Sequence, residues 1–77
     1  MHYATRLNRR KLAENIDWYL LERNMSKSEF GRQVGISRSH VANLTSGRTE
    51  PSLGIALKII KVLGISLETL LEGTEEL

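Results

Sequence analysis

The residues with the clearest chemical potential lie close together in the segment from Ser37 to Asn43. Within it, Arg38, Ser39, His40 and Asn43 supply a guanidinium, a hydroxyl, an imidazole and an amide. If the segment is a helix, we expect these side chains on its outer face, with no apolar residue interrupting that face. All four groups donate hydrogen bonds, and such groups can reach base edges or phosphates. The segment is therefore a candidate recognition surface for a polyanion.

Catalytic and metal chemistry have little support in the sequence. Ser, His and Asp are all present, but a hydrolytic triad must converge in one pocket, and His40 is expected on a solvent-facing helix. His2 and His40 are too few to bind zinc without cysteine, which the chain lacks. Gly31, Gly35 and Gly47 are each explained by packing or a helix cap, so no phosphate-binding loop is indicated. The sequence predicts that the protein is not an enzyme and uses no metal or cofactor.

Two short helices joined by a tight turn, over residues 26–47, must position the candidate surface. Ser26 can cap the first helix. Glu29, three residues later, is at the capping-box position, from which its side chain can reach back to Ser26. Gly35 permits the left-handed backbone of the turn, and Ser37 can cap the second helix two residues later. This pattern predicts a helix-turn-helix.

A glycine lies where the two helices of the motif would touch. The apolar residues around it are placed to face a common core. They are Phe30, Val34, Ile36, Val41 and Leu44. At Gly31 we expect alanine to be tolerated or even stabilising, because glycine inside a helix costs about 1 kcal/mol relative to alanine. Valine there should overpack the crossing.

The first predicted helix runs from about Asn8 to Arg23. Its inner face is expected to carry Leu12, Ile16, Tyr19 and Leu20. A second apolar stripe, made by Leu7, Trp18 and Leu21, lies on the opposite side. Packing by the C-terminal helix is the favoured explanation of this stripe, and a surface for a partner protein is the alternative.

Two more helices are predicted after the motif. One is capped by Ser52 and ends before Gly64, and the other is short, capped by Ser66 and ended by Gly73. The core stripe of the longer helix is predicted to be Leu53, Ala56, Leu57, Ile60 and Leu63. Its remaining apolar residues, Ile55, Ile59 and Val62, widen the apolar face of the helix beyond what one small core can bury. The apolar residues of the short helix are Leu67, Leu70 and Leu71.

The predicted architecture is all-α, a compact five-helix bundle with a central helix-turn-helix. Residues 8–73 form the domain, residues 1–7 a flexible N-terminal arm, and residues 74–77 a short acidic tail. A chain of 77 residues makes a marginal core, which leaves partnership open. Because the sequence has no signal-like or membrane-spanning apolar run, a cytoplasmic protein is expected.

Charge is segregated along the chain. Residues 1–48 hold nine Lys or Arg against four acidic residues, whereas residues 49–77 hold two lysines against five. The basic front half contains the motif and is the electrostatic footprint that a polyanion binder needs. An ordinary solvated surface remains the alternative on charge alone.

The segments SKSEFGRQVGISRSHVANLTSG and RTEPSLGIALKIIKVLGISLETLLEG resemble the helix-turn-helix domains of the lambda-repressor-like (Xre/Cro) family. The resemblance extends from Leu12 to about Gly73. It implies that the helix after Ser37 enters the major groove of double-stranded DNA. The base-reading residues it implies are Ser37, Arg38, Ser39, His40 and Asn43. The phosphate-binding residues it implies are Lys27, Ser46, Arg48 and Thr49.

The marginal core and the surplus residues Ile55, Ile59 and Val62 predict a homodimer. The same resemblance places its contact at the last helix and the loop before it, with Ile65, Leu67 and Leu71 as candidates.

Two features depart from the family. Glutamine pairs common at the reading positions are replaced here by Arg38 and Ser39. An Arg–Glu pair that links the first helix to the end of the reading helix in several members is replaced by Leu20 and Thr45.

The function implied is a DNA-binding transcriptional regulator, of the phage-repressor or restriction-modification-controller type, that binds an operator as a dimer. The alternative is an antitoxin-like or antirepressor-like module with the same fold, whose main ligand is another protein. The surplus of apolar residues on the first and fourth helices supports that alternative.

Overall fold

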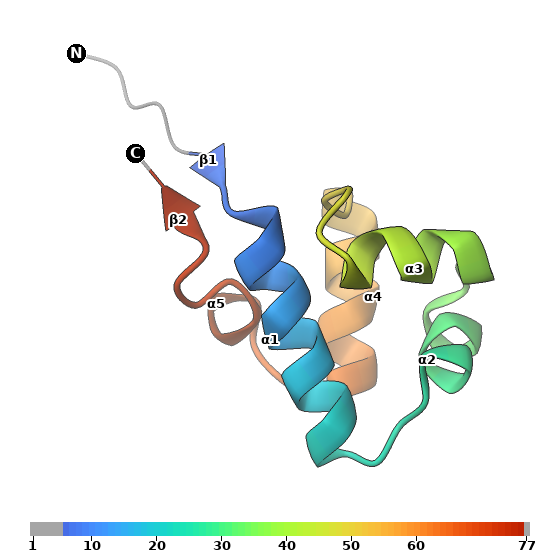
Figure 1. The fold of residues 1–77 in the computed structure, drawn as a ribbon. Coiled ribbons are helices and arrows are strands. Elements are labelled where there is room, and N and C mark those ends of the chain that lie inside the picture. The colour runs from blue at the N-terminus through green and yellow to red at the C-terminus, as the bar shows by residue number, and fades with distance from the viewer. Residues whose placement is uncertain (1–5, 77) are drawn as a thin grey trace.

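The computed structural model of the chain describes residues 6–76. Five helices and two short strands follow one another along the chain (Figure 1). They are β1 (Arg6–Leu7), α1 (Arg9–Glu22), α2 (Lys27–Val34), α3 (Arg38–Thr45), α4 (Leu53–Leu63), α5 (Leu67–Leu70) and β2 (Glu75–Glu76). The prediction of a five-helix bundle with a central helix-turn-helix is confirmed. None of these helices is long and apolar enough to cross a membrane.

Each helix begins at a side chain that accepts a hydrogen bond from a backbone N–H three residues on. The capping residues are Asn8, Ser26, Ser37, Ser52 and Ser66. Such caps satisfy N–H groups that have no partner within the helix, which is why these residues determine where the helices begin. Gly35 ends α2 in the left-handed conformation, with φ +83°. These predicted boundaries are therefore found in the structure.

The capping box at α2 is only half formed. Ser26 accepts from the backbone N–H of Glu29 at 3.0 Å. The Glu29 carboxylate does not return to Ser26 but accepts from Gln33 at 2.8 Å and pairs with Arg32. The hydrogen bond from Gln33 and the adjacent guanidinium lower the pKa of Glu29. Partners one turn ahead thus compete successfully for this carboxylate.

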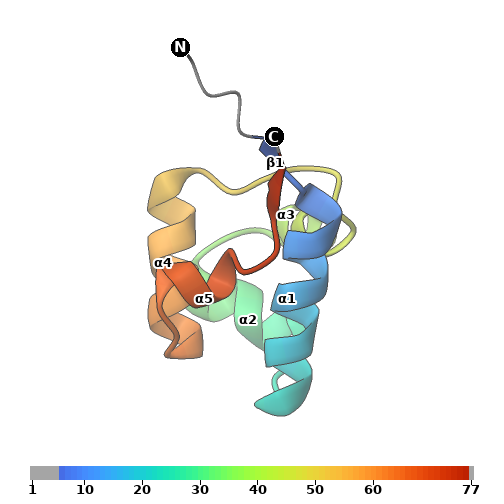
Figure 2. The same cartoon turned by 90° about the vertical axis from the view of Figure 1, so that its left-hand side faces the viewer.

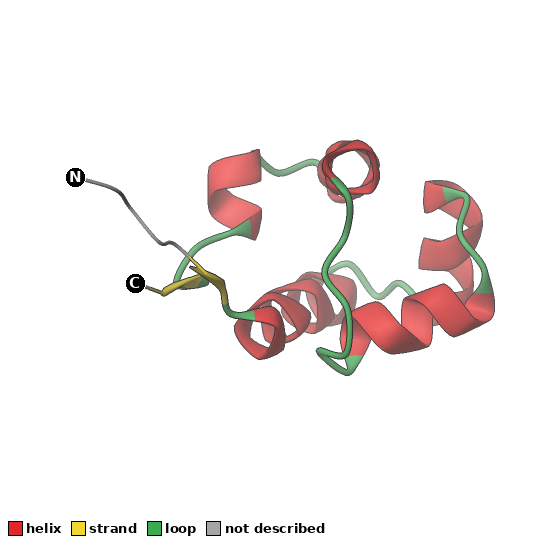
Figure 3. Cartoon of the chain, turned by 90° about the horizontal axis from the view of Figure 1, so that it is seen from above, coloured by secondary structure: helices red, strands yellow, loops and turns green. Residues whose placement is uncertain are grey.

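The core contains large apolar side chains from all five helices. They are Leu12, Ile16, Leu20, Phe30, Val34, Val41, Leu44, Ile59, Leu63 and Leu70. In Figure 3, α4 is seen end-on across from α1 and α3, so the core lies between them. Figure 2 shows α5 crossing between α4 and α1.

The predicted core stripe of α4 is partly wrong. Leu53 and Leu57 are exposed, whereas Ile59, which was assigned to the surplus, is fully buried. The buried stripe is instead Ala56, Ile59 and Leu63. Because α4 carries apolar residues around most of its circumference, its periodicity alone does not determine which side faces the core.

The favoured explanation of the second stripe is wrong for Trp18 and Leu21, whereas Leu7 is half-buried against the core. Trp18 keeps 55% of its surface exposed and Leu21 keeps 81%, so α5 does not cover them. The helix α5 is anchored instead by Asn15, whose amide donates to the carbonyls of Leu70 and Glu72, each at 2.9 Å. With only four residues, α5 is too short to cover the rest of α1.

The sequence analysis did not predict the two strands. Arg6 pairs with Glu76 and Leu7 with Glu75 in an antiparallel arrangement. Thr74, placed by the prediction in the acidic tail, is buried, and its carbonyl accepts from the N–H of Asn8 at 2.6 Å. Strands of two residues are too short to show an alternating pattern in the sequence. Their pairing depends on the positions of the start of α1 and the end of α5. Residues 1–5 of the predicted arm and Leu77 of the tail lie outside the described residues.

Candidate nucleic-acid interface

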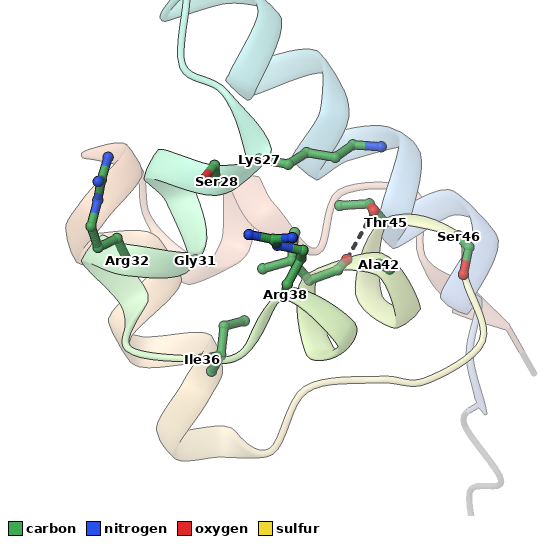
Figure 4. Close-up of a pocket in the computed structure, with 10 residues that line it drawn as sticks. Lys27, Ser28, Gly31, Arg32, Ile36, Arg38, Ala42, Thr45 and Ser46 are labelled. Carbon is green, nitrogen blue, oxygen red and sulfur yellow. Dashed lines mark hydrogen bonds between the residues drawn. The ribbon is translucent and has the colours of Figure 1, made fainter.

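A groove of about 670 Å³ lies between α2 and α3, at the end of the molecule away from the strands (Figures 1 and 4). Its lining includes three cations and no acidic residue. The polar residues of the lining are Lys27, Ser28, Arg32, Arg38, Thr45 and Ser46. Gly31, Ile36, Val41 and Ala42 complete it. A groove lined in this way offers hydrogen-bond donors and positive charge to an anionic ligand.

The crossing of α2 and α3 is close because α2 has a glycine there. A Cβ atom on Gly31 would lie 2.8 Å from Cγ2 of Val41 and 3.3 Å from the carbonyl oxygen of Ile36. The placement of Gly31 at the crossing is therefore supported. The expectation that alanine is tolerated needs revision, because Val41 is buried and its β-branched side chain is stiff.

The predicted reading residues do not share one face of α3. At 100° per residue, Arg38 and His40 lie about 160° apart around the helix. Arg38 lines the groove, and Ser39 is exposed beside it, whereas His40 and Asn43 are half-buried. The predicted reading residues that are exposed are therefore Ser37, Arg38 and Ser39.

The exposed surface of α3 also includes a residue that the sequence analysis missed. Ala42 is exposed and lines the groove one turn after Arg38, so an apolar residue does interrupt the polar face. The i, i+4 spacing from Arg38 was the available signal. A methyl group at such a position can contact a thymine methyl.

Lys27 and Arg38 approach the groove from different helices. In the view of Figure 4, Arg38 reaches from α3 toward α2, while Lys27 extends from the first turn of α2 and Arg32 points away. Among the described residues, the only ion pairs within 4.0 Å are Arg23 with Glu22 and Arg32 with Glu29. The charges of Lys27 and Arg38 are thus not neutralised by a carboxylate.

The segment after α3 is held by carbonyl groups of α3, and three of its hydrogen bonds converge on one of them. The carbonyl oxygen of Asn43 accepts from the N–H of Arg48 at 3.0 Å, from that of Thr49 at 3.4 Å and from the hydroxyl of Ser46 at 3.2 Å. Ser46, Arg48 and Thr49, the predicted phosphate residues of this segment, are all exposed. Their backbone is fixed by α3 while their side chains remain accessible.

Basic residues from the start of α1 lie beside this segment. Arg6, Arg9 and Arg10 border a shallow cavity of about 810 Å³ together with Gly47. Arg9 donates from Nη1 to the carbonyl oxygen of Arg48 at 3.0 Å. The sequence shows the basic cluster, but it gives no signal that a guanidinium contacts a carbonyl 39 residues away.

Leu20 and Thr45 make no polar link between α1 and α3. Leu20 is buried, and Thr45, also buried, donates its hydroxyl to the carbonyl of Val41 within α3 at 2.8 Å. In the described part of the chain, no buried side-chain polar atom lacks a hydrogen-bond partner. The two positions therefore carry no hydrogen bond in place of the family's Arg–Glu pair.

The predicted dimer residues Ile65, Leu67 and Leu71 are half-buried against the monomer core. Each therefore contributes to the monomer and also keeps exposed area. Ile59 is not part of an exposed apolar surface, because its side chain is fully buried. Leu53 and Leu57 are the exposed large apolar residues of α4.

Two capped helices crossing at a glycine, with a cationic groove beside the second helix, define a helix-turn-helix DNA-binding domain. The family model described as helix-turn-helix matches residues 16–70. The chain belongs to the Xre/lambda-repressor-like helix-turn-helix family of transcriptional regulators. Members of this family bind DNA and are typically not enzymes.

Known proteins with similar sequences or structures have related descriptions. An uncharacterised HTH-type transcriptional regulator of Archaeoglobus fulgidus is 34% identical over 53 residues, covering 69% of this chain and 75% of the relative. SinR, a master regulator for biofilm formation, solved in complex with DNA, has a TM-score of 0.73 and 29% identity, covering 79% of this chain and 98% of that one.

A second structure of SinR, in complex with the SinI protein, has a TM-score of 0.75 and 28% identity, covering 80% of this chain and 61% of that one. The restriction-modification controller protein C.AhdI from Aeromonas hydrophila has a TM-score of 0.76 and 22% identity, covering 80% of this chain and 94% of that one. The likeness to C.AhdI shows the fold alone.

Proposed function

We propose that the protein is a sequence-specific regulator that binds an operator in double-stranded DNA as a homodimer. The observation that carries the proposal is the exposed edge of α3, where Arg38 and Ser39 lie beside a groove lined by cations and by no acidic residue. An α-helix fits the major groove of B-DNA, and a guanidinium can make two parallel hydrogen bonds to one guanine. Arg38 is therefore the principal base-reading residue.

The other predicted reading residues have narrower roles. Ser39 is exposed and can donate to or accept from a base edge. The hydroxyl of Ser37 already accepts from the N–H of His40 at 3.1 Å, which leaves its proton to donate. His40 and Asn43, both half-buried, face the flank of α3 away from Arg38. His40 and Asn43 therefore contact only the part of the DNA site that lies farthest from Arg38.

Phosphate contacts flank the reading edge. Lys27, in the first turn of α2, lies where the helix dipole adds to its own positive charge. Ser46, Arg48 and Thr49 contact the backbone at the other end of α3. Contacts of this kind position the protein and carry no sequence information.

Dimerisation would place two reading helices on one face of the DNA. Ile65, Leu67 and Leu71 form the contact, with α5 packed against its own copy, and an isologous interface of this kind requires an operator with inverted symmetry. The two copies of α3 should lie about 34 Å apart, one turn of DNA. SinR and C.AhdI are similar in fold, and SinR was solved with DNA, which supports the proposal.

The test is selection of bound sequences from random DNA, followed by sedimentation of the protein with the selected site. We expect an inverted repeat and two protein chains per duplex. A one-to-one complex on a site without inverted symmetry would exclude the dimer. Failure to enrich any sequence would exclude specific DNA binding.

A protein-interaction module is the second candidate, and the exposed Trp18 and Leu21 on α1 favour it. SinR is known in complex with a protein as well as with DNA. Trp18 is the only tryptophan, so its fluorescence reports on that surface. If this candidate is correct, Trp18→Ala with Leu21→Ala abolishes protein capture and leaves DNA binding unchanged.

A further inference from the structure

The segment between α3 and α4 is held from two sides over residues 46–49, which we call the clamped loop. On the α3 side, the carbonyl of Asn43 accepts from the N–H groups of Arg48 and Thr49. On the α1 side, Nη1 of Arg9 donates to the carbonyl of Arg48 at 3.0 Å. The peptide group before Arg48 is therefore engaged by α3, and the peptide group after it is engaged by both helices.

Backbone packing supports the α1 side of the clamped loop. Gly47 has φ +80°, and a Cβ atom there would lie 3.1 Å from Cα of Arg10 and 3.3 Å from its nitrogen. The loop thus rests directly on the first turn of α1. The Arg9 side chain extends beyond this contact and donates to the carbonyl of Arg48, the residue after Gly47.

The Arg9 contact has no duplicate. Among the described residues, it is the one side-chain hydrogen bond that connects α1 with residues 35–50. Leu20 and Thr45, farther along the same pair of helices, are buried and form no hydrogen bond between the helices. Arg9 also lies outside residues 16–70, the part matched by the family model. The family model therefore does not cover this contact.

We infer that Arg9 is a positioning residue for DNA binding: its hydrogen bond to the clamped loop holds Arg48 and Thr49 where they meet a phosphate. This inference rests on the proposed function. In this inference Arg9 acts through the loop, by the hydrogen bond from its Nη1 to the Arg48 carbonyl. A loop held from one side only would have to be ordered when DNA binds, at a cost in affinity.

Arg10 provides a matched control. It lies on the same turn, carries the same charge and is exposed, and its contact with Gly47 is through backbone atoms that Arg10→Ala retains. Arg9→Ala and Arg10→Ala therefore remove the same charge from nearly the same place. Only Arg9→Ala removes the hydrogen bond to the loop.

The first measurement uses the full chain without DNA. Hydrogen exchange of the Arg48 and Thr49 amides should be faster in Arg9→Ala than in wild type and unchanged in Arg10→Ala, because only the first variant frees the loop. Thermal melts of both variants establish that the fold is intact. Equal exchange in the two variants would show that Arg9 does not hold the loop.

The second measurement is titration of the selected operator at several salt concentrations. Arg9→Ala should weaken binding about fivefold more than Arg10→Ala, as loss of one hydrogen bond implies. Its salt slope should fall by about one further unit, because a phosphate contact of the loop is lost. In an Arg48→Ala background, most of the extra loss should disappear, since the positioned side chain is absent.

Two results would overturn the inference in different ways. If the losses from Arg9→Ala and Arg48→Ala simply add, Arg9 contributes charge or its own phosphate contact and does not act through the loop. If wild type enriches no DNA sequence, the proposed function fails together with the DNA role of Arg9. In that case, the exchange measurement still decides whether Arg9 holds the loop.

Discussion

Replacing Gly31 with alanine has two opposing effects of similar size on the stability of the protein. Alanine is favoured over glycine inside a helix by about 1 kcal/mol. The new methyl group would lie 2.8 Å from Cγ2 of Val41, well inside the roughly 3.5–4.0 Å at which carbon atoms attract. Val41 is buried and β-branched, so it cannot rotate away without strain. Overpacking of this kind costs about 1–3 kcal/mol, and we expect a net loss of stability of up to about 2 kcal/mol.

A double-mutant cycle tests this reasoning. Val41→Ala alone should destabilise by about 2 kcal/mol, because it removes two buried methyl groups. In Gly31→Ala with Val41→Ala, the new methyl occupies space that the valine vacated, so the double variant should be more stable than the sum of the single effects predicts by about 1 kcal/mol. Urea denaturation of the four proteins gives the coupling free energy.

Gly54 provides the control for backbone effects. It also lies within a helix, and a Cβ atom there would meet nothing closer than the Ser52 hydroxyl oxygen at 4.0 Å. Gly54→Ala should therefore stabilise the protein by up to about 1 kcal/mol. If Gly31→Ala were as stabilising as Gly54→Ala and showed no coupling to Val41→Ala, the close crossing of α2 and α3 would be refuted.

Three other predictions address the site and the core. Arg38→Ala should lose about 1–3 kcal/mol on the correct operator and tolerate a changed base pair at one position in each half-site, as titrations of single-base variants would show. Lys27→Ala should weaken binding to all sequences alike and lower the salt slope by about one unit. Ile59→Ala should destabilise by about 2–5 kcal/mol, whereas Leu53→Ala, at a site that is 69% exposed, should change stability by less than about 0.5 kcal/mol in thermal melts. Equal melting of those two variants would contradict the assignment of the buried side of α4.

Local signals in the sequence predicted the helices well. A serine cap or a glycine stop acts through backbone groups within three or four residues, so Ser26, Gly35 and Ser37 were sufficient to locate the motif. The competing use of the Glu29 carboxylate was not predictable, because Arg32, Gln33 and the Ser26 N–H are all within its reach.

Errors arose where two explanations satisfied the same pattern. In α4, Leu53 and Leu57 fit the helical period as well as Ile59 does, and only the positions of α2 and α5 decide which side is buried. For Trp18, packing by the C-terminal helix and a partner surface fit the same stripe, and α5, with four residues, leaves Trp18 exposed. Both outcomes depend on the lengths and angles of neighbouring helices, which a single chain pattern does not contain.

The helix α3 is held by two different kinds of contact. At its fourth residue, Val41, it packs against Gly31, and after its end, the loop is joined to α1 by Arg9. Val41 lies about 6 Å along the helix axis from the end of α3, since each residue of helix rises 1.5 Å. The two contacts share no residue, and the effects of mutations at sites without shared partners usually add.

The Gly31 contact and the Arg9 contact should therefore affect different parts of DNA recognition. Gly31→Ala tilts α3 near Arg38, so it should reduce discrimination between bases while leaving the salt slope nearly unchanged. Arg9→Ala acts near Arg48, so it should lower the salt slope while leaving base discrimination nearly unchanged. Titration of the double variant should give the sum of the two losses. A strongly non-additive result would mean that α3 moves as one rigid body with its loop, and that the two contacts do not act independently.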